Sequence, residues 1–291
     1  MAYIVEQINT ILAQEQVRVR LFISVDQSTD GTEELLARWD GREPRITLLP
    51  LGRRFGGAGP NFYRLLREVS LDGFDYLSFA DQDDIWHPDK LRRAHECLRL
   101  RNAQGYSSNV TAFWPNGASR VVDKAHPQRQ WDFLFESAGP GCTYVFSSPL
   151  AKALQQLVQQ ADTNLKGVDY HDWLSYAFAR THGFAWFVDA APSMQYRQHA
   201  SNQIGVNSGA RSFALRVRKV LNGYAFQQAL RIAQAVGVDE QPLVRRGLRG
   251  GRSGYLWLAL QCGQCRRKPL DRLWFFLSCV FMACKGPVHP V

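Results

Sequence analysis

The sequence is poor in cysteine and has no long apolar run, and each absence excludes a class of protein. Six cysteines among 291 residues are too few for a disulfide-stabilised scaffold, so reduced thiols are expected. A nearly uncharged apolar stretch, residues 273–284, is far shorter than the roughly 20 residues that span a bilayer. No basic segment followed by an apolar one opens the chain, so no signal peptide is expected. These features predict a cytoplasmic protein.

Acidic residues are scarce at the C-terminal end. Residues 205–291 contain 14 Lys and Arg against 3 Asp and Glu, whereas residues 1–204 contain 21 against 23. The net charge of +9 therefore comes from a basic C-terminal appendage, which suits an anionic lipid surface. Residues 273–284 fit either an interfacial helix with cationic flanks or a helix packed on the rest of the protein. No nucleic-acid-binding module is recognised, so no nucleic-acid partner is expected.

The remaining composition is that of a globular α/β protein, with 45% apolar and 21% charged residues. Alternating helices and apolar strands predict a mostly parallel sheet covered by helices on both faces. The polar, irregular stretch 100–131 is assigned no chemistry. Helices are predicted at residues 3–14, 61–68, 149–160 and 225–236 and from His171, and strands at 18–24, 46–49, 76–80, 139–146 and 184–188.

Three carboxylates, Asp81, Asp83 and Asp84, directly follow the predicted strand 76–80. Like charges this close raise one another's pKa unless a cation is bound between them. The C-terminal end of a strand in an α/β sheet is where ligands bind, and hard oxygen ligands suit Mg or Mn. Taken alone, an Asp-x-Asp motif favours the other interpretation, a solvated acidic turn before a helix, so the rest of the chain has to decide.

Further motifs occur at fixed places along the chain: VDQSTDGT at 25–32, RFGGAGPNF at 54–62, FADQDDIW at 79–86, HDW at 171–173 and YRQH at 196–199. In this order and spacing they resemble the inverting family 2 glycosyltransferases, most closely a bacterial rhamnosyltransferase-like branch. The resemblance implies a GT-A fold, with a catalytic domain at residues 1–205. Residues 206–291 are then a basic helical C-terminal extension that could associate with a membrane.

The resemblance also implies roles for individual residues. Asp172, at the start of a helix, is expected to be the general base that deprotonates the acceptor hydroxyl, with Asp169 as the alternative. Asp26 is expected to accept a hydrogen bond from the imide of a uracil or thymine base. The expected contacts to the rest of the donor are Arg54, Asp81, Arg197 and His199, and the expected metal ligands are Asp81, Asp83, Asp84 and His199.

The implied activity is a metal-dependent, inverting hexosyl transfer in cell-surface polysaccharide synthesis. The donor would be dTDP-rhamnose or a UDP-sugar, the metal Mg or Mn, and the acceptor a glycan or a lipid-linked saccharide. The protein would act in the cytoplasm, peripherally on the inner membrane. Two alternatives remain: a catalytically impaired binding or scaffold protein, and a phosphohydrolase with an Asp nucleophile. The phosphohydrolase is disfavoured because Asp84 stands where that motif has Thr or Val.

The resembling proteins begin with an apolar strand before the helix that here starts near Tyr3. That strand is central in their sheet, so its absence is expected to leave two strand edges unpaired. We therefore expect either that the natural start lies upstream of Met1 or that the chain is truncated and impaired.

Overall fold

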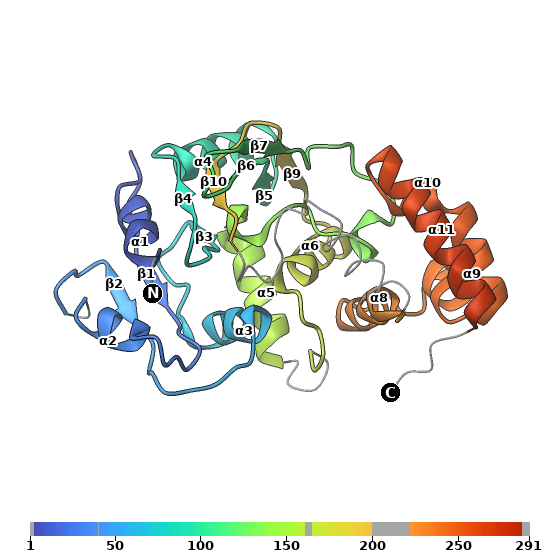
Figure 1. The fold of residues 1–291 in the computed structure, drawn as a ribbon, viewed down its shortest axis with the longest axis horizontal. Helices are drawn as coiled ribbons and strands as arrows, with labels where there is room; N and C mark the ends of the chain where they lie inside the picture. The colour runs from blue at the N-terminus through green and yellow to red at the C-terminus, as the bar shows by residue number, and fades with distance from the viewer. Residues whose placement is uncertain (1–2, 40, 161–164, 200–221, 287–291) are drawn as a thin grey trace.

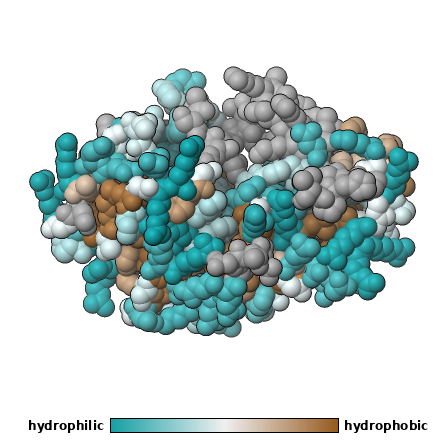
Figure 2. Space-filling model, turned by 90° about the horizontal axis from the view of Figure 1, so that it is seen from below, coloured by the Kyte–Doolittle hydropathy of each residue, from teal (hydrophilic) through white to brown (hydrophobic). Residues whose placement is uncertain are grey.

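The computed structural model describes residues 3–39, 41–160, 165–199 and 222–286. Strands and helices alternate up to residue 199, and the elements described at residues 222–286 are all helical (Figure 1). The face seen from below is mostly hydrophilic, with apolar residues reaching the surface at both ends (Figure 2).

One end of the molecule is a small unit of two helices and two strands. The apolar face of the first helix, with Ile4 and Ile8, packs on Val25, Leu36 and Ile46. This packing confirms the predicted amphipathic helix at residues 3–14 and the two short strands that follow it. The elements are α1 (Ile4–Leu12), β1 (Leu21–Ile23), α2 (Thr32–Ala37) and β2 (Ile46–Leu48), with β1 and β2 parallel.

The central sheet has the strand order β3-β8-β5-β9 and combines antiparallel and parallel pairs. Helices α3, α5 and α6 contact one another, and the main hydrophobic core includes residues of all three. The elements are α3 (Ala58–Glu68), β3 (Tyr76–Ser78), α4 (Lys90–Leu100), β5 (Gly105–Ser108), β8 (Val145–Ser147), α5 (Ser148–Gln160), α6 (His171–Thr181) and β9 (Trp186–Asp189).

The polar stretch 100–131, to which the sequence assigned no chemistry, supplies a central strand of this sheet. All four residues of β5 are buried, including Ser107 and Ser108. Their hydroxyls are satisfied inside the protein, where Ser107 bonds the carbonyl of Ala138 and Ser108 bonds Ser193. A strand can therefore be buried here without an apolar sequence.

A second four-stranded sheet has the order β4-β10-β6-β7. It connects the YRQH motif to residues 81–84, which are called the acidic box from here on. Strand β4 directly follows Asp84 and pairs antiparallel with β10, which ends at Arg197. The pairing brings two motifs that are more than 100 residues apart to the same place. The strands are β4 (Ile85–Trp86), β6 (Val110–Phe113), β7 (Ser119–Val122) and β10 (Met194–Arg197).

Strands β1 and β3 each have one edge without a strand partner among the described residues. β1 pairs only with β2 and β3 only with β8, and all six residues of β1 and β3 are only half-buried. Residues of both strands line the same cleft. The two unpaired edges expected from the sequence are thus present in the described part of the chain.

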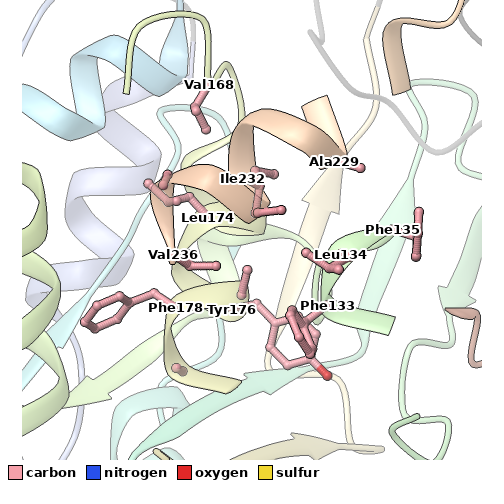
Figure 3. Packing of buried hydrophobic residues seen from close by; sticks show 14 of the residues in the cluster. Phe133, Leu134, Phe135, Val168, Leu174, Tyr176, Phe178, Ala229, Ile232 and Val236 are labelled. Atoms are coloured by element: carbon pink, nitrogen blue, oxygen red, sulfur yellow. The ribbon is translucent and has the colours of Figure 1, made fainter. Parts of the chain in front are cut away.

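The C-terminal helices share one hydrophobic core with the rest of the protein. Ala229 and Ile232 of α8, and Val236 just after its end, pack with Leu174 of α6 and with Leu134 (Figure 3). No helix within the described ranges combines the length and apolarity needed to cross a membrane. The elements are α8 (Tyr224–Ala235), a π-helical turn at Leu243–Leu248, α9 (Gly251–Leu260), α10 (Cys262–Cys265) and α11 (Pro269–Lys285).

The predicted domain boundary at 205/206 lies outside the described residues. All six cysteines are free thiols.

Candidate active site

The acidic box lies between β3 and β4, at the C-terminal end of β3. Oxygens of Asp81 and Asp84 and the sulfur of Cys142 all lie within 4.8 Å of one another. Burial and the neighbouring charges of Asp83 and Asp172 raise the pKa of Asp81 to about 7. Burial, Asp81 and Asp83 likewise raise the pKa of Asp84. The carboxylates thus repel one another in a poorly hydrated place, and a cation would relieve that repulsion.

The residues present fit a divalent cation. Asp84 Oδ2 is buried and has no hydrogen-bond partner among the described residues, so one acceptor is left for a ligand. An Asp83 oxygen lies 2.7 Å from His199 Nε2, which adds an imidazole to the carboxylates. Carboxylate oxygens with one imidazole suit Mg or Mn. Burial raises the pKa of the Cys142 thiol, so this sulfur stays protonated beside the carboxylates and is a poor ligand.

Arg197 holds the acidic box in place. Its backbone N–H donates to Asp84 Oδ1 at 3.2 Å, and its Nε donates to the Asp83 carbonyl at 2.9 Å. The guanidinium also pairs with Glu6 of α1 and stacks over Tyr3. These contacts explain why the YRQH motif accompanies the acidic box, and they give Arg197 a structural task in addition to the predicted contact to the donor diphosphate.

Asp172 lies in the first turn of α6, where its Oδ1 accepts the Trp173 N–H at 2.8 Å. The helix dipole and this hydrogen bond favour the anion, but burial outweighs them and raises the pKa of Asp172 to about 6. A carboxylate with this pKa is ionised at neutral pH and basic enough to accept a proton. The alternative base, Asp169, is exposed, and its carboxylate accepts hydrogen bonds from Tyr224 and Gln228 of α8.

His171, which precedes Asp172, is a packing residue. Its ring stacks on the Phe62 ring of α3, with 3.8 Å between the ring centres, and meets the Phe79 ring edge-on, with 5.1 Å between the centres. Burial lowers the pKa of His171 to about 3, so the ring is neutral. In the HDW motif, His171 thus fixes the start of α6 by packing against aromatic rings, and Asp172 places a carboxylate in the cleft.

Asp26 anchors a neighbouring loop. Its two carboxylate oxygens accept the N–H groups of Phe55 and Gly56 at 2.7 and 2.9 Å. The loop 54–62 is thereby tied to the end of β1. Its Arg54 is exposed and does not line the cleft, so the described arrangement does not bring this arginine to the other predicted donor contacts.

Residues of the predicted set meet in one cleft of about 4000 Å³. Two further lining residues, Lys124 and Ser137, were not predicted as site residues, and both favour the anionic form of Asp172. They come from the stretch before β8, and nothing in their sequence spacing indicates that they approach α6. The residues of the predicted set that line the cleft are Asp26, Asp81, Asp83, Asp169, Asp172 and His199.

Comparison with known proteins identifies the relatives of this chain. Residues 2–135 match the model of glycosyl transferase family 2. The chain is 40% identical over 279 residues to the dTDP-rhamnosyl transferase RfbG of Shigella flexneri, an alignment that covers 96% of each protein. It is also 30% identical over 109 residues, 36% of the chain and 42% of the relative, to the putative teichuronic acid biosynthesis glycosyltransferase TuaG of Bacillus subtilis (strain 168).

The fold is similar to that of a solved structure, S. aureus TarS 1-349 in complex with UDP-GlcNAc. The TM-score is 0.54 at 13% sequence identity, and the match covers 98% of this chain and 87% of the TarS 1-349 chain. This likeness confirms the predicted GT-A fold and the helical C-terminal region. The prediction of a mostly parallel sheet was wrong, because β8, β4 and β7 each pair antiparallel with their neighbours.

Proposed function

The chain belongs to glycosyl transferase family 2 and is an inverting glycosyltransferase, and we propose that it transfers rhamnose from dTDP-rhamnose to a glycan or lipid-linked acceptor. One observation carries the choice of donor: the chain is 40% identical to a dTDP-rhamnosyl transferase over nearly the whole length of both proteins. The product would be a saccharide destined for the cell surface.

In this proposal Asp172 is the catalytic base. It takes the proton of an acceptor hydroxyl while that oxygen forms a bond to the anomeric carbon of the donor sugar. The bond from that carbon to the diphosphate oxygen breaks on the opposite face, and its electron pair leaves with dTDP. A single displacement of this kind inverts the anomeric configuration.

Asp81, Asp83, Asp84 and His199 would hold a divalent cation, Mg or Mn. When bound, the cation supplies positive charge that stabilises the leaving diphosphate. Arg197 keeps the acidic box in position through its contacts with Asp83 and Asp84. Asp26 fixes the loop at Phe55 and Gly56 and contributes its remaining lone pairs to the nucleobase side of the cleft.

We place the enzyme on the cytoplasmic face of a membrane. Large apolar side chains are exposed on α9 and α11, beside the basic residues of the C-terminal region. Such a face favours an anionic lipid surface, where each nearby Lys or Arg contributes about 1 kcal/mol. The exposed side chains are Leu256, Leu260, Leu270, Leu273, Trp274, Phe276, Leu277 and Phe281.

The donor is tested by incubating the protein with Mn²⁺, a detergent extract of bacterial membranes and a panel of sugar nucleotides. Release of the nucleoside diphosphate and the mass of the glycolipid product are measured. We expect dTDP release and an added deoxyhexose only with dTDP-rhamnose, and loss of both when EDTA is present. Transfer from a UDP-sugar but not from dTDP-rhamnose would overturn the proposed donor.

A further inference from the structure

Arg267, in the short link between α10 and α11, is buried deep in the protein although it belongs to the basic C-terminal region. Its side chain is 2% exposed and lies 3.5 Å from Asp132 and 3.4 Å from Glu136. Its backbone N–H also donates to Glu136 Oε1 at 2.7 Å. The C-terminal region is thus attached to the segment 132–137 by a buried ion-pair network.

The same guanidinium bonds two backbone carbonyls beside the cleft. One nitrogen donates to the carbonyl of Ser137, and the other donates to the carbonyl of Lys124 at 3.5 Å. These are the two residues whose side chains favour the anionic form of Asp172. A single side chain therefore fixes the main chain of both.

Residues 137–141, which are called the wall from here on, pack against Asp172. The Ser137 hydroxyl donates to the Gly139 carbonyl at 3.0 Å, and a Cβ placed on Gly141 would lie only 3.0 Å from the Asp172 Cβ. A Cβ on Gly139 would lie 3.7 Å from the Lys124 Cβ. The wall and Lys124 thus pack as one layer beside the carboxylate.

Arg267 is also linked to the helix that carries Asp172. Its partner Asp132 accepts hydrogen bonds from Tyr176 at 3.0 Å and from Arg180 at 2.8 Å, and both donors belong to α6. The guanidinium lies 5.7 Å from the centre of the Tyr176 ring. Arg267 therefore joins the wall to helix α6. The distance between these two elements determines the surroundings of Asp172.

We infer that Arg267 is a positioning residue for catalysis: from the C-terminal region it holds the wall 137–141 and helix α6 in the geometry that orients Asp172. The inference rests on the proposed function, because it takes Asp172 as the base. Lysine cannot replace this arginine, since it has no planar fork to bond two carbonyls and two carboxylates at once.

The test compares the wild type with Arg267→Lys, which keeps the charge and removes the fork, and with Ser137→Ala, which removes a hydroxyl of the wall. The titration midpoint of Asp172 is measured by carbon NMR of protein labelled at the aspartate carboxyls, and the resonance is assigned by its loss in Asp172→Asn. The acid limb of dTDP release from dTDP-rhamnose, with water as acceptor, is measured in parallel.

We expect both variants to raise the Asp172 midpoint and the acid limb by about half a pH unit or more, because the anion loses stabilising contacts. Arg249→Met is the matched control, since Arg249 pairs with Asp239 and Glu240 on the surface of the same region. It should leave both values unchanged.

Unmoved midpoints in folded Arg267→Lys and Ser137→Ala would overturn the inference. If Arg267→Lys does not fold, Glu136→Gln decides by the same midpoint, because it removes a charge that pairs with Arg267 and leaves Ser137 and Lys124 in place. Undiminished dTDP release by Asp172→Asn would instead overturn the assigned base, and the NMR midpoint would still report whether Arg267 positions Asp172.

Discussion

At the scale of single residues, the raised pKa of Asp172 predicts how activity depends on pH. A base must be ionised to accept a proton, and burial places the pKa of this carboxyl at about 6. The transfer rate should therefore be constant above pH 7 and fall about tenfold per pH unit below pH 6. Initial rates of dTDP release between pH 4.5 and 8.5, at saturating Mn²⁺, measure this limb.

The variant Asp172→Asn should lower the rate about a thousandfold and leave donor binding intact. Asp169→Asn is its control, because Asp169 is exposed and bonded to α8, and it should keep most of the activity. The reverse result would move the role of the base to Asp169.

Burial and crowding by like charges destabilise the ionised form of Asp84. Its Oδ2 is buried without a hydrogen-bond partner among the described residues, and neighbouring carboxylates raise its pKa. Asp84→Asn should therefore raise the thermal midpoint in EDTA by a few degrees, equivalent to about 1 kcal/mol, and should reduce the additional rise that Mn²⁺ gives the wild type. Differential scanning fluorimetry with and without Mn²⁺ measures both.

The matched variant Asp89→Asn removes a charge of the same kind that is only paired with Arg92 at 3.6 Å. It should leave the response to Mn²⁺ as it is in the wild type. An equal Mn²⁺ response in Asp84→Asn and in the wild type would contradict a role for Asp84 in the cation site.

The sequence predicted the carboxylates of the site better than their surroundings. Asp81, Asp83, Asp84 and Asp172 stand in local motifs, at a strand end and a helix start, which can be read from neighbouring residues. Lys124 and Ser137 approach Asp172, and Arg267 bonds their carbonyls, only in the tertiary fold, so no spacing in the chain reveals these residues. Asp26 illustrates the same limit, since its bonds to the loop at Phe55 and Gly56 depend on how that loop returns.

At the scale of elements, helix α3 approaches the turn before helix α6 so closely that only glycine fits at one position. A Cβ on Gly59 would lie 2.2 Å from the backbone carbonyl oxygen of Asp169, which cannot move without displacing the turn before α6. Gly59→Ala should destabilise the protein by about 1–3 kcal/mol and lower activity further by shifting α6. Urea unfolding and the rate of dTDP release measure the two effects.

Gly263→Ala is the control for this change. Position 263 lies in α10 with open space around it, so alanine should be neutral or stabilise the helix by up to about 1 kcal/mol. Equal stability of the two variants would show that α3 does not depend on its close approach to residue 169.

Apolar elements could be predicted from the sequence, whereas polar buried ones could not. The helical spacing of apolar residues predicted the bounds of α1, α5 and α8 to within about two residues, because each of these helices buries one face against apolar neighbours. Strand β5 has the sequence Gly-Tyr-Ser-Ser and escaped prediction, because its serines are buried through hydrogen bonds rather than through apolar packing. Such compensation is visible only in the folded protein.

At the scale of the whole molecule, the apolar face of α11 predicts how the enzyme meets a lipid surface. Leu273 and Leu277 are 53% and 46% exposed, one helical turn apart. Changing both to Asp should lower binding to vesicles of anionic phosphatidylglycerol at least about tenfold, because apolar area is lost and negative charge is added. Vesicle flotation measures binding.

The control for these changes is Leu100→Asp, at the end of α4, where the leucine is 84% exposed and remote from α11 in the fold (Figure 1). It should bind vesicles as the wild type does. Unchanged flotation of the α11 variant, or no binding by the wild type, would contradict attachment through this face.

The unpaired edges of β1 and β3 predict where the molecule opens most easily. Sheet β1-β2 is joined to the rest without a ladder between β1 and β3 in the described part of the chain, so its three-residue strands depend on side-chain packing such as that of Phe22 on Phe74. Strand β5, in contrast, is buried and paired on both edges.

Amide hydrogens of β1 and β2 should therefore exchange at least about tenfold faster than those of β5, which corresponds to about 1.4 kcal/mol less protection. Hydrogen exchange read by mass spectrometry on peptides covering residues 19–26, 45–50 and 104–109 measures the difference. Equal protection of the three peptides would mean that the β1-β2 sheet and the central sheet open together. Side-chain packing would then couple β1 to the central sheet as strongly as backbone hydrogen bonds couple β5 to its neighbours.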